Sequence, residues 1–198
     1  LARQREASDV QRGLAAWLGA EVSDLTQPSA GGLSSETYLF RAGGRELVLR
    51  LPPAGDALFP HYNLLAQSFV MQILAEHAVV PVPEVVAYVD DDTYLGAPFL
   101  VMARVEGRVP TDNPSYLVEG WVHDASPDQQ RTLQDAFVDV CARINACAWD
   151  DMGLAFLARP GGTGLDAEIA WWSDYLDWAA DGAELPQLHD ALAWCSAN

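Results

Sequence analysis

Two short runs with strand character flank Gly43-Gly44 and constrain the fold more than any other feature of the sequence. Aromatic and aliphatic residues dominate Thr37–Ala42 and Leu47–Leu51. A Gly-Gly pair between such runs is typical of a tight β-hairpin, because glycine adopts the positive φ values that these turns need. Pro52-Pro53 ends the second run, since proline has no N–H for a sheet ladder. The sequence therefore predicts an antiparallel hairpin at this point.

Apolar patterns on both sides of the hairpin predict further elements. Helical spacing of apolar residues predicts helices over Ser8–Leu18 and Tyr62–His77. Strand-like runs are Val22–Pro28, Glu84–Val89 and Phe99–Val105. The order is hairpin, one helix and then two more strands. We therefore expect a small antiparallel sheet that carries a helix.

The pattern changes after Gly107. Val109–Asp124 is rich in proline and polar residues and predicts an irregular connector, and Ser126-Pro127-Asp128-Gln129 is a capping-box pattern at the start of a helix. Further helices are expected over Ala167–Ala180 and Leu188–Trp194. The fold class is thus α+β, with a β-rich unit over residues 1–104 and a connector with helices over 105–198.

Composition excludes several classes of function. Of 198 residues, 28 are acidic and 11 basic, which gives a net charge of -17 and argues against binding to nucleic acid or to anionic membranes. The three cysteines form no CxxC pair and the four histidines have no HxxxH or HExxH spacing, so no zinc site is expected. No apolar run reaches membrane-spanning length. These features predict a reducing, cytoplasmic setting.

A glycine- and serine-rich turn precedes the first strand of the hairpin. Gly31 and Gly32 let the backbone approach a ligand closely, and Ser34 and Ser35 add hydroxyl donors. Arg50, at the end of the hairpin, can offer a planar bidentate fork to the same anion. The turn is therefore a candidate phosphate site. The alternative is a simple turn between strands, since neither GxGxxG nor GxxxxGK[ST] is present.

The order and spacing of several segments resemble the aminoglycoside phosphotransferase-like family, in particular the branch related to acyl-CoA dehydrogenase-associated kinases. The resemblance extends over nearly the whole chain. The segments that carry it are Gly31–Tyr38, Val48–Pro53, Phe59-Pro60, Val80–Pro83, Pro98–Gly107, Asp112–Pro114, Gly120-Trp121 and Ala125–Pro127. The resemblance implies a protein-kinase-like fold, with a small β-rich N-lobe that binds the nucleotide and a helical C-lobe.

The resemblance also implies roles for residues around the hairpin. The turn Gly31–Ser35 would cover the ATP phosphates, and Arg50 would stand where kinases place the strand lysine that pairs them. Val48, two residues earlier on the strand, would face the same way and line the adenine slot. The helix glutamate that normally pairs with the strand cation falls at Gln67, a neutral residue. Gln67 is therefore a candidate partner of Arg50, and because a Gln–Arg hydrogen bond is weaker than an ion pair, a different position of Arg50 is the alternative.

The segment between the two lobes has an implied role as well. Met102 to Val105 would form the hinge, with backbone groups of Ala103 and Val105 bonding to the adenine edge. The implied activity is transfer of the ATP γ-phosphate, with Mg²⁺, to a hydroxyl group of a small molecule. The branch resemblance favours a hydroxyacyl-CoA acceptor over an antibiotic.

One part of the kinase pattern is missing from the sequence. Phosphoryl transfer needs a catalytic-loop Asp with an Asn five residues later and a further metal-binding Asp. No asparagine of this chain follows an aspartate at that distance. The catalytic base and metal ligands are therefore expected beyond Asn198, and the 198-residue chain is expected to be inactive alone. The alternative is a non-catalytic kinase-like module that binds a nucleotide or a partner.

Overall fold

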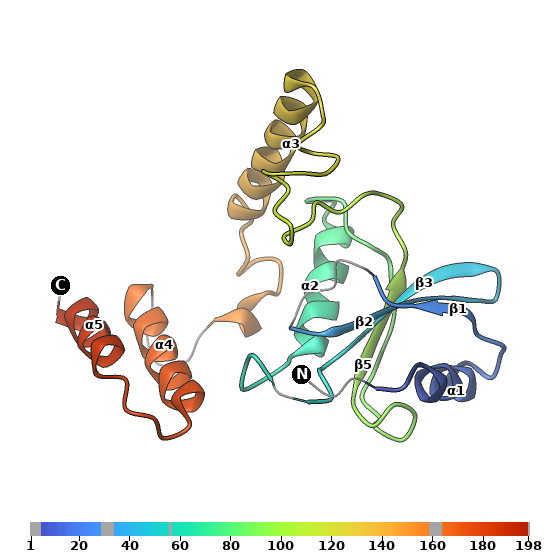
Figure 1. Ribbon diagram of the computed structural model, residues 1–198, viewed down its shortest axis with the longest axis horizontal. Helices are drawn as coiled ribbons and strands as arrows, with labels where there is room; N and C mark the ends of the chain where they lie inside the picture. Colours follow the sequence, from blue (N-terminus) through green and yellow to red (C-terminus); the bar gives the residue numbers. More distant parts are fainter. Residues whose placement is uncertain (1–4, 29–33, 56, 159–163, 198) are drawn as a thin grey trace.

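The computed structural model describes residues 5–28, 34–55, 57–158 and 164–197, and its N-terminal part is built around one antiparallel sheet (Figure 1). The sheet has five strands in the order β1-β2-β3-β5-β4. The strands are β1 Ser23–Thr26, β2 Glu36–Ala42, β3 Arg45–Leu51, β4 Val85–Val89 and β5 Phe99–Ala103. The expected α+β fold is confirmed. The last strand ends at Ala103 rather than at Val105.

The predicted hairpin joins β2 and β3. Ala42 pairs with Arg45, so the loop consists of Gly43 and Gly44 alone. Their φ values are 56° and 76°, and at both positions a residue with a side chain would have a strained backbone. This conformation matches the right-handed twist of the two strands. The local sequence is thus sufficient to set the register between β2 and β3.

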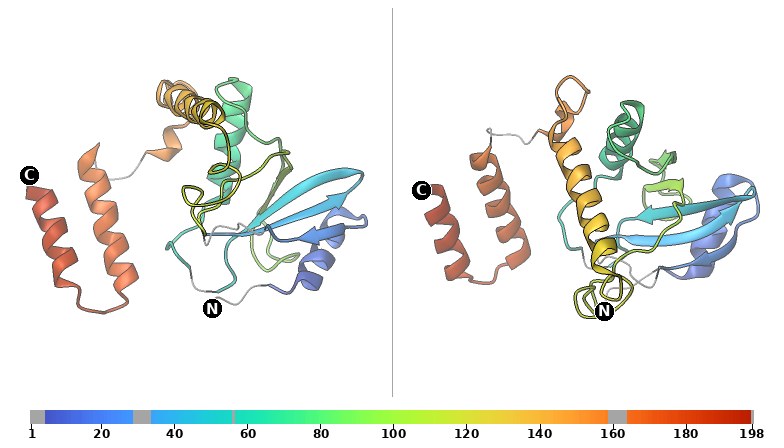
Figure 2. Two further views of the ribbon diagram at one scale, coloured as in Figure 1. Left: turned by 45° about the horizontal axis from the view of Figure 1, so that its top comes forward. Right: turned by 90° about the horizontal axis from the view of Figure 1, so that it is seen from above.

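Two helices, α1 Ala7–Leu18 and α2 Leu64–Glu76, lie on opposite sides of the sheet (Figures 1 and 2). Helix α1 packs Val10 and Leu14 into the main hydrophobic core. The strands contribute to this core the side chains of one face, Tyr38, Phe40, Ala42, Leu47, Leu49, Leu51, Phe99 and Val101. The opposite face carries the alternate residues of β2, β3 and β5, because successive side chains of a strand point to opposite sides.

Gly13 marks the closest approach of α1 to the loop before β5. A Cβ at this position would lie 2.2 Å from the Tyr94 carbonyl oxygen and 2.5 Å from Leu95 Cδ2. We expect Gly13→Ala to destabilise the protein by about 1–3 kcal/mol, because the backbone clash outweighs the better helix propensity of alanine. Gly107→Ala is the matched control, since its Cβ would meet no atom within 4 Å. Urea unfolding measures both, and a Gly13→Ala variant as stable as the parent would contradict the close packing.

The second half of the chain is helical. Residues 109–124 form an irregular, turn-rich connector, and the helices that follow are α3 Pro127–Asn145, a 3-10 turn η1 Ala155–Leu157, α4 Leu165–Ala180 and α5 Pro186–Ala197. Ser126 caps α3 in the predicted capping box with Gln129. Helices α4 and α5 form a neighbouring antiparallel pair away from the sheet (Figure 2). The proposed boundary between residues 104 and 105 stays a prediction.

Hydrogen bonds and ring contacts connect the helical half to the N-terminal part. Arg143 of α3 donates from Nη2 to the carbonyl oxygen of Ala78 at 3.2 Å, just after α2. Tyr175 of α4 donates from its hydroxyl to the carbonyl oxygen of Leu58 at 2.9 Å, and its ring lies against Phe59. Phe156 of η1 lies against Phe69 of α2, with ring centroids 6.2 Å apart, so the contacts reach α2 and the segments that flank it. The side of the sheet that carries α2 is therefore the side that faces the helical half.

Candidate functional site

Arg50 and Val48 lie on the face of the sheet opposite α1. They alternate along β3 with Leu47, Leu49 and Leu51, which are buried in the core on the α1 side. Across the ladder, Arg50 pairs with Leu100 and Val48 pairs with Met102. These residues form two rows on the α2 side. The implied nucleotide-facing residues Val48, Arg50 and Met102 therefore share one face, as the strand period requires.

Arg50 is held by the end of the serine-rich turn. Its Nη2 donates to the hydroxyl oxygen of Ser35 at 3.1 Å, so the strand cation and the turn meet. Among the described residues Arg50 has no carboxylate partner. Ser34 lies just before Ser35, whereas Gly31 and Gly32 lie outside the described residues. The part of the turn that the structure describes thus ends beside a guanidinium whose charge is not neutralised.

Gln67 does not pair with Arg50 in the structure. Helix α2 packs over β4 and β5, whereas Arg50 stands on β3. Within the described chain the Gln67 Oε1 atom is buried and accepts no hydrogen bond. The expected Gln67–Arg50 hydrogen bond is therefore not formed, because the Ser35 hydroxyl is within reach of Arg50 and the neutral amide has no charge to attract it.

The segment with the implied hinge role, Met102 to Val105, begins at the end of β5. The Ala103 N–H donates to the carbonyl oxygen of Glu84 at 2.8 Å, and the Arg104 N–H donates to that of Glu46 at 3.1 Å. Because its N–H is already bonded, Ala103 can offer its carbonyl oxygen as the acceptor of a hydrogen bond from a nucleobase amino group. Val105 is 67% exposed, and its N–H has no partner in the described part of the chain. An acceptor at Ala103 and a donor at Val105 suit the edge of a purine.

A buried carboxylate beside the turn was missed by the sequence reasoning. Glu36, 7% exposed, follows Ser35 directly. Its Oε2 lies 3.2 Å from Arg5 Nη1 and accepts from the Tyr38 hydroxyl at 3.1 Å, while its Oε1 accepts from the Ala54 N–H at 2.8 Å. The sequence signal that could have found it is the alternation of side chains along a strand, which places Glu36 on the same face of β2 as Tyr38 and Phe40. Glu36 thus ties together the N-terminal segment, β2 and the turn after β3.

Tyr38 remains a hydrogen-bond donor at neutral pH. Burial first, and then the charge of Glu36 and its hydrogen bond, raise the pKa of the Tyr38 phenol to about 12. Because the phenol keeps its proton, it can donate to the Glu36 carboxylate. The network therefore holds one carboxylate, one guanidinium and one neutral phenol, a balanced set for a buried position.

Other classes of site find little support in the part of the chain that is described. No group of three or more His, Cys, Asp or Glu side chains is arranged to hold a metal ion among the described residues. Cys141, Cys147 and Cys195 are free thiols. Within the same residues, no helix combines the length and apolar composition needed to cross a bilayer.

The sheet order, the helix between β3 and β4 and the strand cation define a protein-kinase-like phosphotransferase fold. Comparison with known proteins gives the family. Residues 25–198 match the model of the phosphotransferase enzyme family known as APH, and the chain belongs to this family.

Related sequences are found in larger proteins. The chain is 24% identical over 173 residues to "Probable acyl-CoA dehydrogenase IBR3" of Arabidopsis thaliana, covering 84% of this chain and 20% of that protein. It is 28% identical over 164 residues to "Acyl-CoA dehydrogenase family member 10" of Mus musculus, covering 82% and 14%. The chain therefore spans a fifth or less of the length of these relatives.

Solved structures share the fold. A protein of Ralstonia eutropha proposed to be an aminoglycoside phosphotransferase superposes with a TM-score of 0.61 at 21% identity, covering 92% of this chain and 51% of that one. The GDP and kanamycin complex of APH(2")-IIia superposes with a TM-score of 0.56 at 15% identity, covering 96% and 57%. At these identities the likeness concerns the fold alone. The expected kinase-like architecture is confirmed.

Proposed function

We propose that the chain is the nucleotide-binding part of an ATP-dependent phosphotransferase that moves the γ-phosphate to a hydroxyl group of a small molecule. The observation that carries the proposal is the position of Arg50. Its guanidinium lies on the α2 side of the sheet, bonds to Ser35 at the end of the serine-rich turn and has no carboxylate partner among the described residues. Such a cation is available for phosphate oxygens.

The remaining residues fit the other parts of a nucleotide. Val48 and Met102 would contact one flat face of the adenine ring, since they pair on the same side of the sheet. The Ala103 carbonyl would accept from the amino group of the base, and the Val105 N–H would donate to a ring nitrogen. Gly31, Gly32 and Ser34 would complete the phosphate cradle with Ser35. APH(2")-IIia, which is similar in fold, was solved with GDP and kanamycin, and this supports nucleotide binding in general.

In this proposal ATP supplies the transferable phosphoryl group, while the residues of this chain bind and orient it. Arg50 would hold phosphate oxygens in place and balance their negative charge. Mg²⁺ would accompany the nucleotide, but the described residues contain no cluster of metal-binding side chains, so no step is assigned to the metal. The catalytic base is likewise assigned to no described residue.

The acceptor we propose is an acyl thioester that carries a hydroxyl group. The support is the likeness to proteins named as acyl-CoA dehydrogenases, which places related sequences in polypeptides named for acyl-CoA chemistry. The proposed setting is the cytoplasm, because the three cysteines are free thiols, as expected in a reducing compartment.

Nucleotide-induced stabilisation tests the proposal. Mg-ATP at about 100 times its Kd should stabilise the 198-residue chain by about 2.7 kcal/mol, measured as a rise in Tm by calorimetry or thermal shift. Adenosine is the matched control, because it keeps the base and lacks the phosphates. If adenosine raises the Tm as much as Mg-ATP at the same concentration, or if Mg-ATP does not raise the Tm, the chain has no site that binds the phosphates.

A second candidate is a kinase-like binding module without catalysis. The observation that favours it is Gln67, whose buried Oε1 has no partner among the described residues and which does not form the pair that an active kinase uses. Phosphate transfer distinguishes the two candidates. The natural full-length protein, supplied with labelled ATP and a hydroxyacyl thioester, should transfer the label if the phosphotransferase is correct. Tight Mg-ATP binding without any transfer would favour the module.

A further inference from the structure

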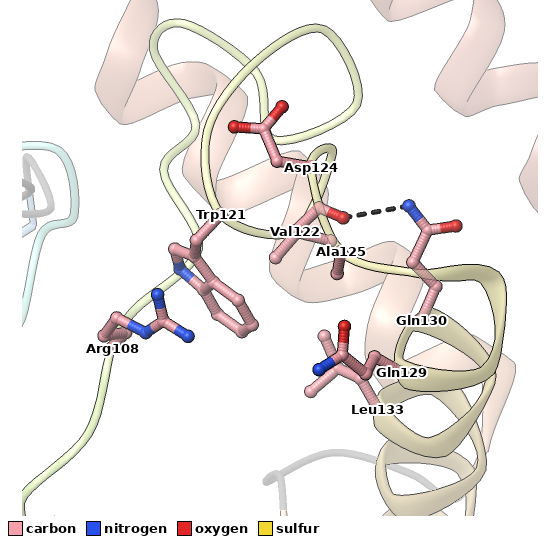
Figure 3. A pocket seen from close by; sticks show the side chains of 8 residues that line it. All are labelled: Arg108, Trp121, Val122, Asp124, Ala125, Gln129, Gln130 and Leu133. Atoms are coloured by element: carbon pink, nitrogen blue, oxygen red, sulfur yellow. Dashed lines mark hydrogen bonds between the residues drawn. The ribbon is translucent and has the colours of Figure 1, made fainter.

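Arg108 stands on the face of an indole ring just after the hinge. Its Cζ lies 4.8 Å from the ring centroid of Trp121 (Figure 3). The indole is itself fixed, since Trp121 Nε1 donates to the carbonyl oxygen of Val109 at 3.3 Å. A guanidinium over an aromatic ring is attracted to the π face without using its N–H groups as hydrogen-bond donors to a carboxylate. The Arg108 fork is thus held in place while its donors stay available.

No carboxylate of the described residues forms an ion pair with Arg108. Among the described arginines, Arg50, Arg108 and Arg131 have no carboxylate partner. The others form ion pairs with aspartate or glutamate; these are Arg5, Arg12, Arg41, Arg45, Arg104 and Arg143. Partners are abundant, because the chain has 28 acidic residues against 11 basic ones. An arginine held by a neutral ring in so acidic a chain is suited to an anion from outside.

A cavity of about 620 Å³ opens beside this pair. Besides Arg108 and Trp121 it is lined by Gln129 and Gln130, from the first turn of α3, and by Asp124. Asp124 does not neutralise Arg108, since its Oδ1 lies 3.0 Å from His123 Nδ1 and its carboxylate points away from the guanidinium (Figure 3). The cavity therefore has a cationic end at Arg108 and amide groups at the start of a helix.

An apolar cavity of similar volume, about 620 Å³, adjoins the first. The two share Val122, Gln130 and Leu133 as walls, and the second continues to Phe137, Leu117 and Tyr116. Gln130 donates from Nε2 to the carbonyl oxygen of Val122 at 2.9 Å, which fixes the shared wall. A ligand that runs along these shared residues would meet a cation at one end and apolar side chains at the other.

We propose that the two cavities form a binding site for an anionic amphiphile. Its carboxylate or phosphate head bonds to the Arg108 fork above Trp121, and its alkyl or acyl chain lies over Leu133 and Phe137. Binding of the amphiphile at this site does not depend on the proposed nucleotide site. Its role as the seat of the acceptor substrate, in contrast, rests on the proposed phosphotransferase function.

Titration of the 198-residue chain with C10 ligands tests the site. Decanoate and decyl phosphate should bind with at least tenfold higher affinity than decanol, which lacks the charge, in isothermal titration calorimetry. The stronger of the two anions identifies the head group. Arg108→Gln should lower the affinity for that anion at least tenfold and leave decanol binding unchanged. Arg131→Gln is the matched control, an arginine without a carboxylate partner that lines neither cavity.

The apolar half is tested by chain length. Affinity of the parent chain should rise from hexanoate to decanoate, and Phe137→Ser should remove most of that rise, because Phe137 is 67% exposed and its replacement should not unfold α3. Equal effects of Arg108→Gln and Arg131→Gln, or equal binding of decanoate and decanol, would overturn the proposal. Mg-ATP titration of the same variants separates the amphiphile site from the phosphotransferase function. If the chain binds the anions but not Mg-ATP, the amphiphile site stands and its role as the acceptor site is withdrawn.

Discussion

Replacing Arg50 by alanine should weaken Mg-ATP binding to the 198-residue chain about 10- to 100-fold. A hydrogen bond to a charged group contributes about 1.5–3 kcal/mol, and each 1.4 kcal/mol is a factor of ten in Kd. Arg50 has Ser35 as its hydrogen-bond partner in the described chain and no carboxylate that would compete with a phosphate. Loss of its side chain should therefore affect the nucleotide more than the fold. Calorimetric titration with Mg-ATP measures the effect.

Two further variants show whether the geometry or the charge of Arg50 matters. Arg50→Lys keeps the charge and loses the planar fork, so its affinity should lie between those of the parent and Arg50→Ala. Arg45→Ala removes an arginine from the same strand that already pairs with Glu84 at 2.8 Å, and should leave Mg-ATP binding unchanged. If Arg45→Ala and Arg50→Ala weaken binding equally, Arg50 contributes only general charge and the proposed site is wrong.

Replacing Glu36 by alanine should destabilise the protein by about 3–5 kcal/mol, the largest effect on stability that we expect outside the apolar core. The change leaves the half-buried Arg5 without its counter-charge. It also removes the acceptor for the Tyr38 hydroxyl and the Ala54 N–H. Breaking one side of a buried ion pair costs this much because the remaining charge stays desolvated. Urea unfolding followed by circular dichroism gives the free energy of unfolding.

Control variants show whether the loss of stability in Glu36→Ala comes from the burial of the ion pair or from the loss of any ion pair. Asp9→Ala breaks the exposed pair between Asp9 and Arg12 and should cost no more than about 1 kcal/mol. Glu36→Gln keeps an acceptor and should fall between the parent and Glu36→Ala, which matters if the alanine variant does not fold. A loss below about 1 kcal/mol for both Glu36 variants would show that the network does not stabilise the fold.

Local patterns were sufficient for most of the fold. The Gly43-Gly44 pair predicted the hairpin, and both residues have the positive φ that its turn requires. Ser126 and Gln129 predicted the start of α3 and form the capping box. These features depend on residues close together in the chain, so neighbouring residues are enough to specify them.

Local patterns were not sufficient for the partners in the candidate site. Arg50 was expected to bond to Gln67, yet it bonds to Ser35, 15 residues away across the hairpin. Glu36 did not stand out in the sequence, although Arg5, 31 residues earlier, pairs with it. The stacking of Arg108 on Trp121 was likewise not foreseen. Partners of this kind depend on which elements pack together, and helix α2 packs over β4 and β5 rather than over β3.

The sequence alone determined the elements, their order, the antiparallel hairpin and the face of β3 that carries Val48 and Arg50, because backbone propensity and side-chain period act over a few residues. Only the tertiary structure decided which carboxylate each arginine meets. Arg45 and Arg50 lie on the same strand of this acidic chain, yet Arg45 pairs with Glu84 and Arg50 meets no carboxylate among the described residues. The physical reason is that ion pairing falls off within a few ångströms, so it depends on three-dimensional position rather than on composition.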